Sequence, residues 1–188
     1  MRDWWLRTLL VLQRPRPVFA ALRDDSDGAV RARGEAVLAL VLLAGIASVL
    51  WTPAMGRLLE DRLVAWDWGL IAVVAFFGGG IYGAAVYWAG GLVLHAAATS
   101  FGASRSYRQA RHLLAFAAAP VGLSLFLVWP VRLAVYGEDV FRSGGSDRGA
   151  GNWAFVAAEL VFVAWALALL ALGLRVFSKA SSSSAGIS

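Results

Sequence analysis

Long apolar runs separated by short polar segments dominate this chain. Four of them extend over residues 35–55, 69–98, 112–135 and 153–174. Each has about 20 residues or more, which lets a helix rising 1.5 Å per residue cross a hydrocarbon core of about 30 Å. The pattern therefore predicts an all-α fold, a polytopic transmembrane helical bundle of four spans within residues 35–176.

The first 34 residues mix arginine, aspartate and apolar side chains, and form a predicted cytoplasmic arm (1–34). On a helical wheel, its tryptophans fall within one broad apolar arc and its arginines lie opposite. Such a helix suits the headgroup plane of a membrane, and packing on the ends of the bundle is the alternative. We expect Pro15 and Pro17 to end this amphipathic helix because proline cannot donate to an amide ladder. The predicted membrane-surface residues are Trp4, Trp5, Arg7 and Arg14.

Polar segments frame the spans on both sides. Residues 24–28 (DDSDG) predict a turn before the first span, and Thr52–Pro53 predicts its end. At the other end of the chain, residues 177–188 form a predicted polar, serine-rich tail outside the membrane.

Tryptophan and arginine gather at opposite ends of the four runs. The tryptophans in question are Trp51, Trp66, Trp68, Trp129 and Trp153, and the basic residues are those of the arm, Arg105, Arg108, Arg111, Arg175 and Lys179. Arginine and lysine mark the cytoplasmic side of a membrane protein, and indole rings favour the interface. We therefore expect a multi-pass protein of the cell membrane with both termini in the cytoplasm.

The net charge of +5 follows the same division. Twelve of the 17 basic residues lie on the predicted cytoplasmic side, so the excess charge sets orientation and can attract anionic lipids. No nucleic-acid-binding motif accompanies it, and we expect no nucleic-acid partner. Cysteine is absent, which excludes disulfides and thiolate metal sites. Sixteen of the 17 basic residues are arginine, which indicates a GC-rich bacterial genome.

Small residues and one proline predict details inside the second and third spans. The sequence Gly78-Gly79-Gly80 is expected to break the second span in its middle. Gly79, Gly83 and Gly91 fall on one face, where small residues let helices approach closely in lipid. That face predicts packing within the bundle, with a homo-oligomer seam as the alternative. Pro120 predicts a kink near residues 116–120, because it frees a backbone carbonyl.

Glu159 is the acid placed inside the fourth run, about two turns from its start. An intramembrane carboxylate is a candidate functional group, and it needs a cation, a proton or water there. Arg132 is its nearest partner by predicted depth. The alternative is a shallow position from which the side chain reaches the interface.

Two stretches resemble the prokaryotic branch of the Ypt/Rab-interacting membrane protein (YIP) family. The arm contains Pro-Arg-Pro-Val-Phe-Ala-Ala-Leu at residues 15–22. The second loop contains Phe-Gly-Ala-Ser-Arg-Ser-Tyr-Arg-Gln-Ala at residues 101–110 and leads to Phe-Ala-Ala-Ala-Pro at 116–120. These match the family's arm pattern and the small-residue loop that precedes a proline-bearing span.

The resemblance implies a helical membrane domain with a cytoplasmic N-terminus. Eukaryotic members of that family act in vesicle traffic and bind Rab-type GTPases, whereas prokaryotic members have no settled activity. The family has five spans as a rule, and the serine-rich end of this chain stands where a fifth would begin. The sequence therefore predicts a family member that lacks the fifth span.

Three classes of function remain. The favoured hypothesis is a non-enzymatic scaffold or adaptor in membrane organisation or trafficking-like processes, with an unknown membrane or cytoplasmic protein partner. Its predicted partner-binding residues are Phe101, Arg105, Tyr107, Arg108 and Arg111. The alternative is a small transporter or channel subunit that uses Glu159 and the kinked third span. An enzyme is not expected, because no catalytic constellation, cofactor motif or metal-ligand spacing is present.

Overall fold

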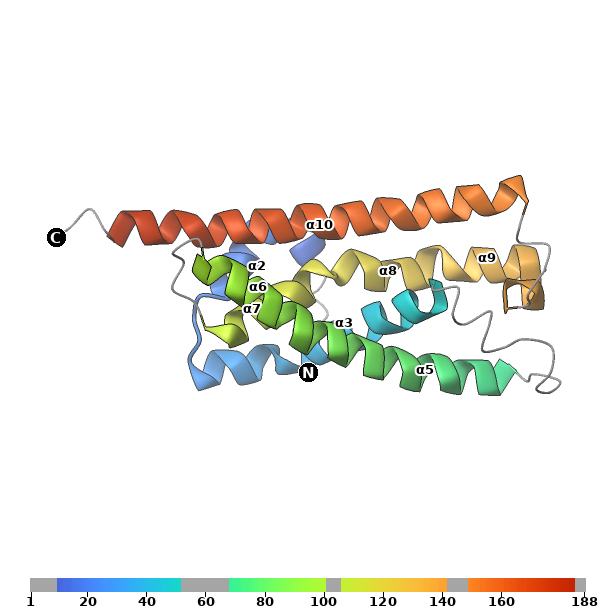
Figure 1. Cartoon of the computed structure of the whole chain (residues 1–188), viewed down its shortest axis with the longest axis horizontal. Helices are drawn as coiled ribbons and strands as arrows, with labels where there is room; N and C mark the ends of the chain where they lie inside the picture. Colours follow the sequence, from blue (N-terminus) through green and yellow to red (C-terminus); the bar gives the residue numbers. More distant parts are fainter. Residues whose placement is uncertain (1–9, 52–67, 101–105, 142–148, 185–188) are drawn as a thin grey trace.

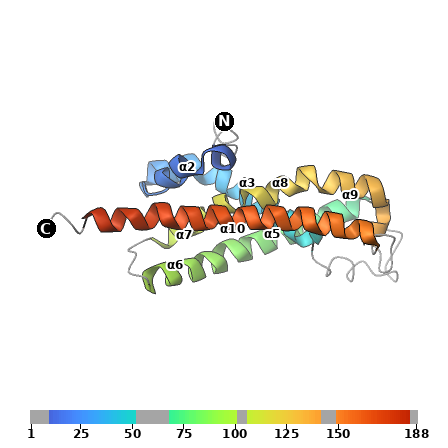
Figure 2. The ribbon, with the colours of Figure 1, turned by 90° about the horizontal axis from the view of Figure 1, so that it is seen from above.

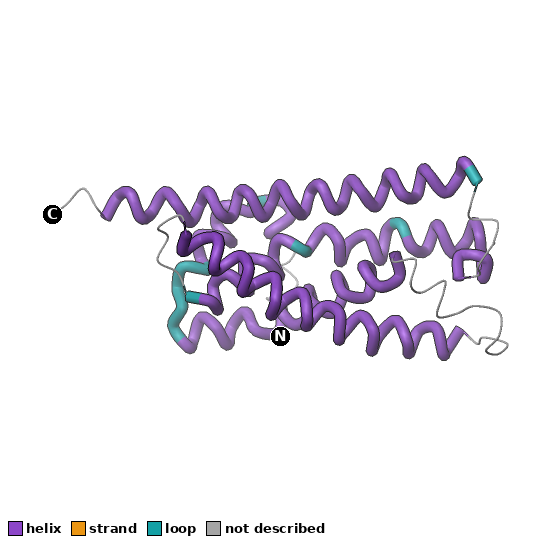
Figure 3. The backbone as a smooth tube through the Cα atoms, viewed as in Figure 1, coloured by secondary structure: helices purple, strands orange, loops and turns teal. Residues whose placement is uncertain are grey.

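The computed structural model describes residues 10–51, 68–100, 106–141 and 149–184 of the 188-residue chain. Within these ranges the secondary structure is helical, with short turns and no strand, as Figure 3 shows. The predicted all-α class is confirmed.

Four long helical rods lie side by side along the long axis of the molecule (Figure 1). In chain order the elements are α2 (Pro15–Ala21), α3 (Asp27–Trp51), α5 (Trp68–Ala85), the π-helix η1 (Val86–Gly90), α6 (Gly91–Ser100), α7 (Tyr107–Ala117), α8 (Ala119–Leu127), α9 (Trp129–Tyr136), the 3-10 helix η2 (Gly137–Phe141) and α10 (Ala150–Ser184). The helices long and apolar enough to cross a membrane are Asp27–Trp51, Ile71–Ser100, Tyr107–Tyr136 and Ala150–Val176. The prediction of four spans is confirmed for the described part of the chain.

The bundle has two distinct ends. We call the end formed by α2, the start of α3, the end of α6 and the start of α7 the arginine end, and the end formed by α9, η2 and the start of α10 the tryptophan end (Figures 1 and 2). α3 packs against α5 and α8, and α10 packs against α8, α7 and α2. The larger apolar core lies toward the arginine end, where Phe19, Leu113 and Phe116 are each almost fully buried.

The arm differs from its prediction in one respect. Residues 10–13 are helical and the helix ends at Arg14, as the prolines predicted, but a second helix, α2, starts directly at Pro15. Proline suits the first turn of a helix because the N–H it lacks has no intrahelical partner there. The short helix buries Phe19 and packs on α10. An amphipathic helix at residues 4–14 lies mostly outside the described residues.

The first span begins earlier than its apolar composition indicated. α3 starts at Asp27, eight residues before the predicted start at residue 35, and it is described as far as Trp51, two residues before Pro53. The turn therefore occupies residues 22–26 instead of 24–28. Arg33 lies inside this helix and is buried, so a charged residue that the sequence placed in the arm belongs to the packed bundle.

The predicted break at Gly78-Gly79-Gly80 is wrong. The helix α5 continues through all three glycines, and the irregularity lies at Val86–Gly90 as a π-helix. Gly79 lies against the backbone of α3, and Gly78 and Gly80 face side chains of the same helix. This close packing holds α5 together where glycine alone would weaken it.

The kink in the third span is confirmed. α7 ends at Ala117 and α8 starts at Ala119, with Pro120 in its first turn. A second proline, Pro130, opens α9 after a break at Val128. In the fourth span, α10 extends to Ser184, so residues 177–184 of the predicted tail continue the helix.

Candidate functional site

Asp25 is the central acceptor of a polar network at the arginine end. Its Oδ1 atom lies 3.2 Å from Nε of Arg108 and 3.4 Å from Nη2 of Arg33. Its Oδ2 atom accepts a 2.7 Å hydrogen bond from the hydroxyl of Ser106. Asp25 belongs to the turn after α2, Arg33 to α3, and Ser106 and Arg108 to the start of α7. One carboxylate therefore joins the arm to two spans.

Arg33 is the buried cation of this network, with 4% of its surface exposed. Its Nε atom donates a 2.8 Å hydrogen bond to Nδ1 of His112, and Nη1 donates to the carbonyl oxygen of Asp24 at 2.7 Å. An arginine has donors only, so Nδ1 of His112 must be an acceptor and the imidazole is neutral, with its proton on Nε2. The imidazole also stacks on Tyr87, with the ring centroids 6.5 Å apart.

The start of α7 is fixed by a capping box and by the arm. Ser106 accepts from the backbone N–H of Gln109 at 3.1 Å, and the Gln109 side chain accepts from the backbone N–H of Ser106 at 3.4 Å. Gln109 Nε2 in turn donates to the carbonyl oxygen of Arg23 at 3.0 Å. Arg23 donates to the carbonyl oxygen of Val176 on α10. Gln109 and Arg23 thus hold α7, the arm and α10 together.

Arg111 occupies a clamp of aromatic rings. Its guanidinium carbon lies 3.8 Å from the ring centroid of Trp88, 4.6 Å from that of Tyr107 and 5.2 Å from that of Tyr87. The hydroxyl of Tyr107 donates a 2.6 Å hydrogen bond to the carbonyl oxygen of Trp88. Tyr87 and Trp88 belong to the π-helix η1, whose extra residue per turn shifts the direction of side chains. The π-helix therefore sets up the clamp.

The acids of the turn balance much of the arginine charge. Asp27 lies 3.4 Å from Nη1 of Arg108. The pKa of the exposed Asp24 is lowered from its ordinary value because the side chain and backbone of Ser26 donate hydrogen bonds to its carboxylate. Exposed basic side chains remain on the arm and the first turns of α3, namely Arg14, Arg16, Arg23 and Arg31. Because acids pair with Arg33 and Arg108, the arginine end is not a uniformly basic surface.

The model of the Yip1 domain matches residues 9–188 of the chain, which is nearly its whole length. The chain belongs to the Yip1 domain family. No curated protein and no solved structure matches it. The resemblance drawn from the arm and the second loop is thereby confirmed at the level of the family.

Three of the five residues predicted to bind a partner lie in the described part of this Yip1 domain. Tyr107 and Arg111 are engaged in the aromatic clamp, and Arg108 pairs with Asp25 and Asp27 while remaining 40% exposed. Phe101 and Arg105 lie outside the described residues. Of the predicted membrane-surface residues, Arg14 is exposed just before α2, and Trp4, Trp5 and Arg7 lie outside the described residues.

The predicted helix-packing glycines have two different neighbours in the Yip1 domain. Gly79 and Gly83 lie against α3 around Gly45, so close that a Cβ atom on any of the three would overlap the opposing backbone. Gly91 lies against the stem of Arg111 on α7. The backbones of α3 and α5 thus approach each other within one chain.

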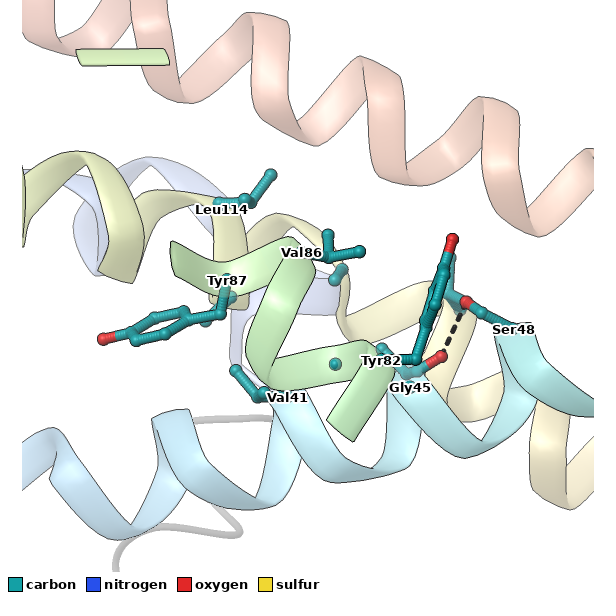
Figure 4. A pocket seen from close by; sticks show the side chains of 12 residues that line it. Val41, Gly45, Ser48, Tyr82, Val86, Tyr87 and Leu114 are labelled. Carbon is teal, nitrogen blue, oxygen red and sulfur yellow. Dashed lines mark hydrogen bonds between the residues drawn. The ribbon is translucent and has the colours of Figure 1, made fainter. Parts of the chain in front are cut away.

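A cavity of about 180 Å³ lies beside this glycine contact, between α3, the α5–η1 junction and the α7–α8 break (Figure 4). Its lining is apolar except for hydroxyl groups such as those of Ser48 and Tyr82. Ser48 uses its hydroxyl proton in a 2.7 Å hydrogen bond to the carbonyl oxygen of Ala44. The lining therefore offers little to a charged ligand and suits an apolar one.

Glu159 is buried between α10 and α8, with 4% of its surface exposed. Its side chain is therefore enclosed by helices, and its depth in the membrane stays a prediction. Its predicted partner, Arg132, attracts the carboxyl group electrostatically and donates a hydrogen bond to Oδ1 of Asn152 at 3.1 Å. Within the described ranges, no group of three or more histidines and acids is placed to bind a metal ion.

Sequence reasoning missed the centre of the network. The sequence predicts an ordinary turn around Asp25 and an orientation signal at Arg33, and it assigns no role to His112. The pairs that join this region to α7, such as Arg33 with His112 and Asp25 with Arg108, lie 79 to 83 positions apart, so no local spacing connects them. The available signal was an arginine and a histidine placed just inside apolar runs, where each requires a polar partner.

Proposed function

We propose that this Yip1 domain protein is a non-enzymatic membrane scaffold or adaptor that docks a protein partner at the arginine end. The observation that carries the proposal is the network around Asp25, which fixes the arm and the starts of α3 and α7 relative to one another. Loops held on a rigid support are the usual place for binding residues. A preorganised surface also loses less entropy when a partner binds.

The proposed docking surface combines Arg108 with the exposed arginines of the arm. Arg108 is 40% exposed and is oriented by two aspartates, so it can present its free N–H groups to a partner carboxylate. Arg14 and Arg16 are exposed on the arm, and Arg31 is exposed near the start of α3. In the proposed orientation, with this end in the cytoplasm, they also meet anionic headgroups of the inner leaflet.

Site-specific cross-linking of the full-length protein in its native membrane tests the proposal. A photo-crosslinker at Ala20, which is exposed on α2, should capture a stoichiometric protein partner. Capture should fall at least tenfold in a variant carrying Arg105→Ser and Arg108→Ser. The matched control carries Arg142→Ser and Arg148→Ser, which the sequence places at the opposite end, and it should retain the partner. Equal capture by the two variants, or none by the parent, would overturn the proposal.

A second candidate function, a small transporter or channel subunit, is favoured by the buried position of Glu159 within a span. Intramembrane acids mark ion pathways in many transporters. Such a role would require assembly of several copies, because one chain offers little polar lining. A cation or proton flux in liposomes that Glu159→Gln abolishes would support transport and count against a purely structural scaffold.

A further inference from the structure

Glu159 lies deep in the span formed by α10. It follows the first residue of the helix, Ala150, by nine positions, which corresponds to about 14 Å along the axis. The residue is 4% exposed, and its Oε1 atom has no hydrogen-bond partner among the described residues. A buried carboxyl oxygen without a donor is unusual in a folded protein and needs an explanation.

The facing helix supplies an acceptor. Ser124 on α8 is fully buried, and its hydroxyl group lies next to the carboxyl group of Glu159. That hydroxyl donates its proton to the carbonyl oxygen of Val121 at 2.9 Å. A hydroxyl has one proton, so Ser124 accepts from Glu159 while that proton is directed at Val121, and it can turn to donate only to an ionised carboxylate. A carboxylate cannot donate, whereas a carboxylic acid can.

Few charges face the carboxyl group. α8 has no titratable side chain between Ala119 and Leu127. On α9, Arg132 and Tyr136 are the titratable groups. Arg132 attracts the carboxyl group of Glu159 electrostatically but donates its hydrogen bond to Asn152, seven positions or about 10 Å before Glu159 on α10.

The remaining helices that pack on α10 meet it far from Glu159. α7 and the arm contact it near Gly173 and Val176, about 20 Å further along the axis. An ionised Glu159 would therefore be desolvated without a directly bound cation, which is strongly unfavourable.

We propose that Glu159 is a proton-binding site inside the membrane, a neutral carboxylic acid that faces Ser124 at the α8–α10 contact. Exchange breaks the O–H bond of the acid and transfers its proton to water, leaving a carboxylate, and the reverse step restores the acid. α10 is the least enclosed span, with 11% of its most apolar stretch buried against 50% for the third span. Exchange with water requires α10 to separate locally from α8 at this contact. This site does not depend on the scaffold role.

A hydrophobic carbodiimide is the probe for such a site, because it adds to protonated carboxylic acids in an apolar environment and forms a stable N-acylurea. The full-length protein is treated in liposomes at several pH values, and the adduct is located by mass spectrometry. We expect a single major adduct at Glu159 that decreases at least tenfold as the pH is raised. Glu159→Gln should lose the adduct, and Glu35→Gln, which changes an exposed acid, should keep it.

Infrared difference spectroscopy covers the case in which the reagent fails to reach the carboxyl group. The spectrum of the parent minus that of Glu159→Gln, both folded by circular dichroism, should contain the carbonyl band of a protonated carboxylic acid. Glu159→Asp should retain such a band. A carboxylate band in its place at neutral pH would overturn the proposal, and so would equal labelling of Glu35 and Glu159. Neither result bears on whether a partner binds at the arginine end.

Discussion

Nε of Arg33 donates a hydrogen bond to Nδ1 of His112 across 79 residues of sequence, and both side chains are at least 95% buried. The bond joins the first span to the third. It also fixes the tautomer of the histidine, since arginine cannot accept a proton. A cation buried this deeply is stable only when its donors are satisfied, and His112, Asp24 and Asp25 together satisfy those of Arg33.

Substitution of His112 by leucine should destabilise the bundle. The change leaves Nε of Arg33 buried without an acceptor, which costs about 1–3 kcal/mol. The matched control is His95→Leu, because His95 is only partly buried and its Nδ1 atom has no hydrogen-bond partner in the described part of the chain. Thermal unfolding in detergent, followed by circular dichroism, should give a lower midpoint for the His112 variant alone. Equal midpoints would show that the bond contributes little.

The glycine contact between α3 and α5 predicts a second loss of stability. A Cβ atom on Gly45 would overlap the carbonyl oxygen of Gly79, which is backbone and cannot rotate away. Gly45→Ala should therefore force the helices apart and cost about 1–3 kcal/mol, as overpacking does elsewhere. Gly78→Ala is the control, since its Cβ atom would lie 3.7 Å from Val49 in ordinary contact. Alanine there should be neutral or slightly stabilising. A stable Gly45→Ala variant would contradict the close approach.

The contact between Arg111 and Trp88 depends on the planar guanidinium group. Arg111→Lys keeps the charge and loses the stacked geometry, so it should cost about 0.5–2 kcal/mol of stability. Trp88→Ala should remove the same interaction. In a double-mutant cycle the two effects should be less than additive, and Arg31→Lys, at an exposed position, should have no measurable effect. Additive effects in the cycle would indicate that the rings and the cation do not interact.

The local features of this fold were predictable where one physical cause acts alone. The lengths of the apolar runs predicted the four spans. Pro120 predicted the kink, because a missing backbone N–H has the same consequence in any helix. The break at Gly78–Gly80 was predicted wrongly because glycine weakens a helix only until another backbone packs against it. The start of α3 at Asp27 was missed for a related reason, since polar residues join a helix when tertiary partners satisfy them.

The candidate site was less predictable. The sequence drew attention to Arg108 and Arg111 through their charge and position, but their partners come from other spans. Asp25 lies 83 positions before Arg108. The Trp88 ring that contacts Arg111 is positioned by a π-helix, which the residue pattern does not predict. Burial of Glu159 likewise depends on how α10 packs against α8. The position of a side chain relative to other helices depends on tertiary packing, and hydrophobic periodicity does not determine it.

The orientation of the bundle can be tested by cysteine accessibility, because the natural chain has no cysteine. Gly28 at the arginine end and Gly149 at the start of α10 are both exposed, with open space around a Cβ atom. With arginine-rich segments retained in the cytoplasm, a membrane-impermeant maleimide should label Gly149→Cys in intact cells. Gly28→Cys should react only after permeabilisation. The two positions flank different spans but share local environments, so a difference in labelling reports sidedness and not burial. Reversed labelling would invert the topology and remove the cytoplasmic docking surface.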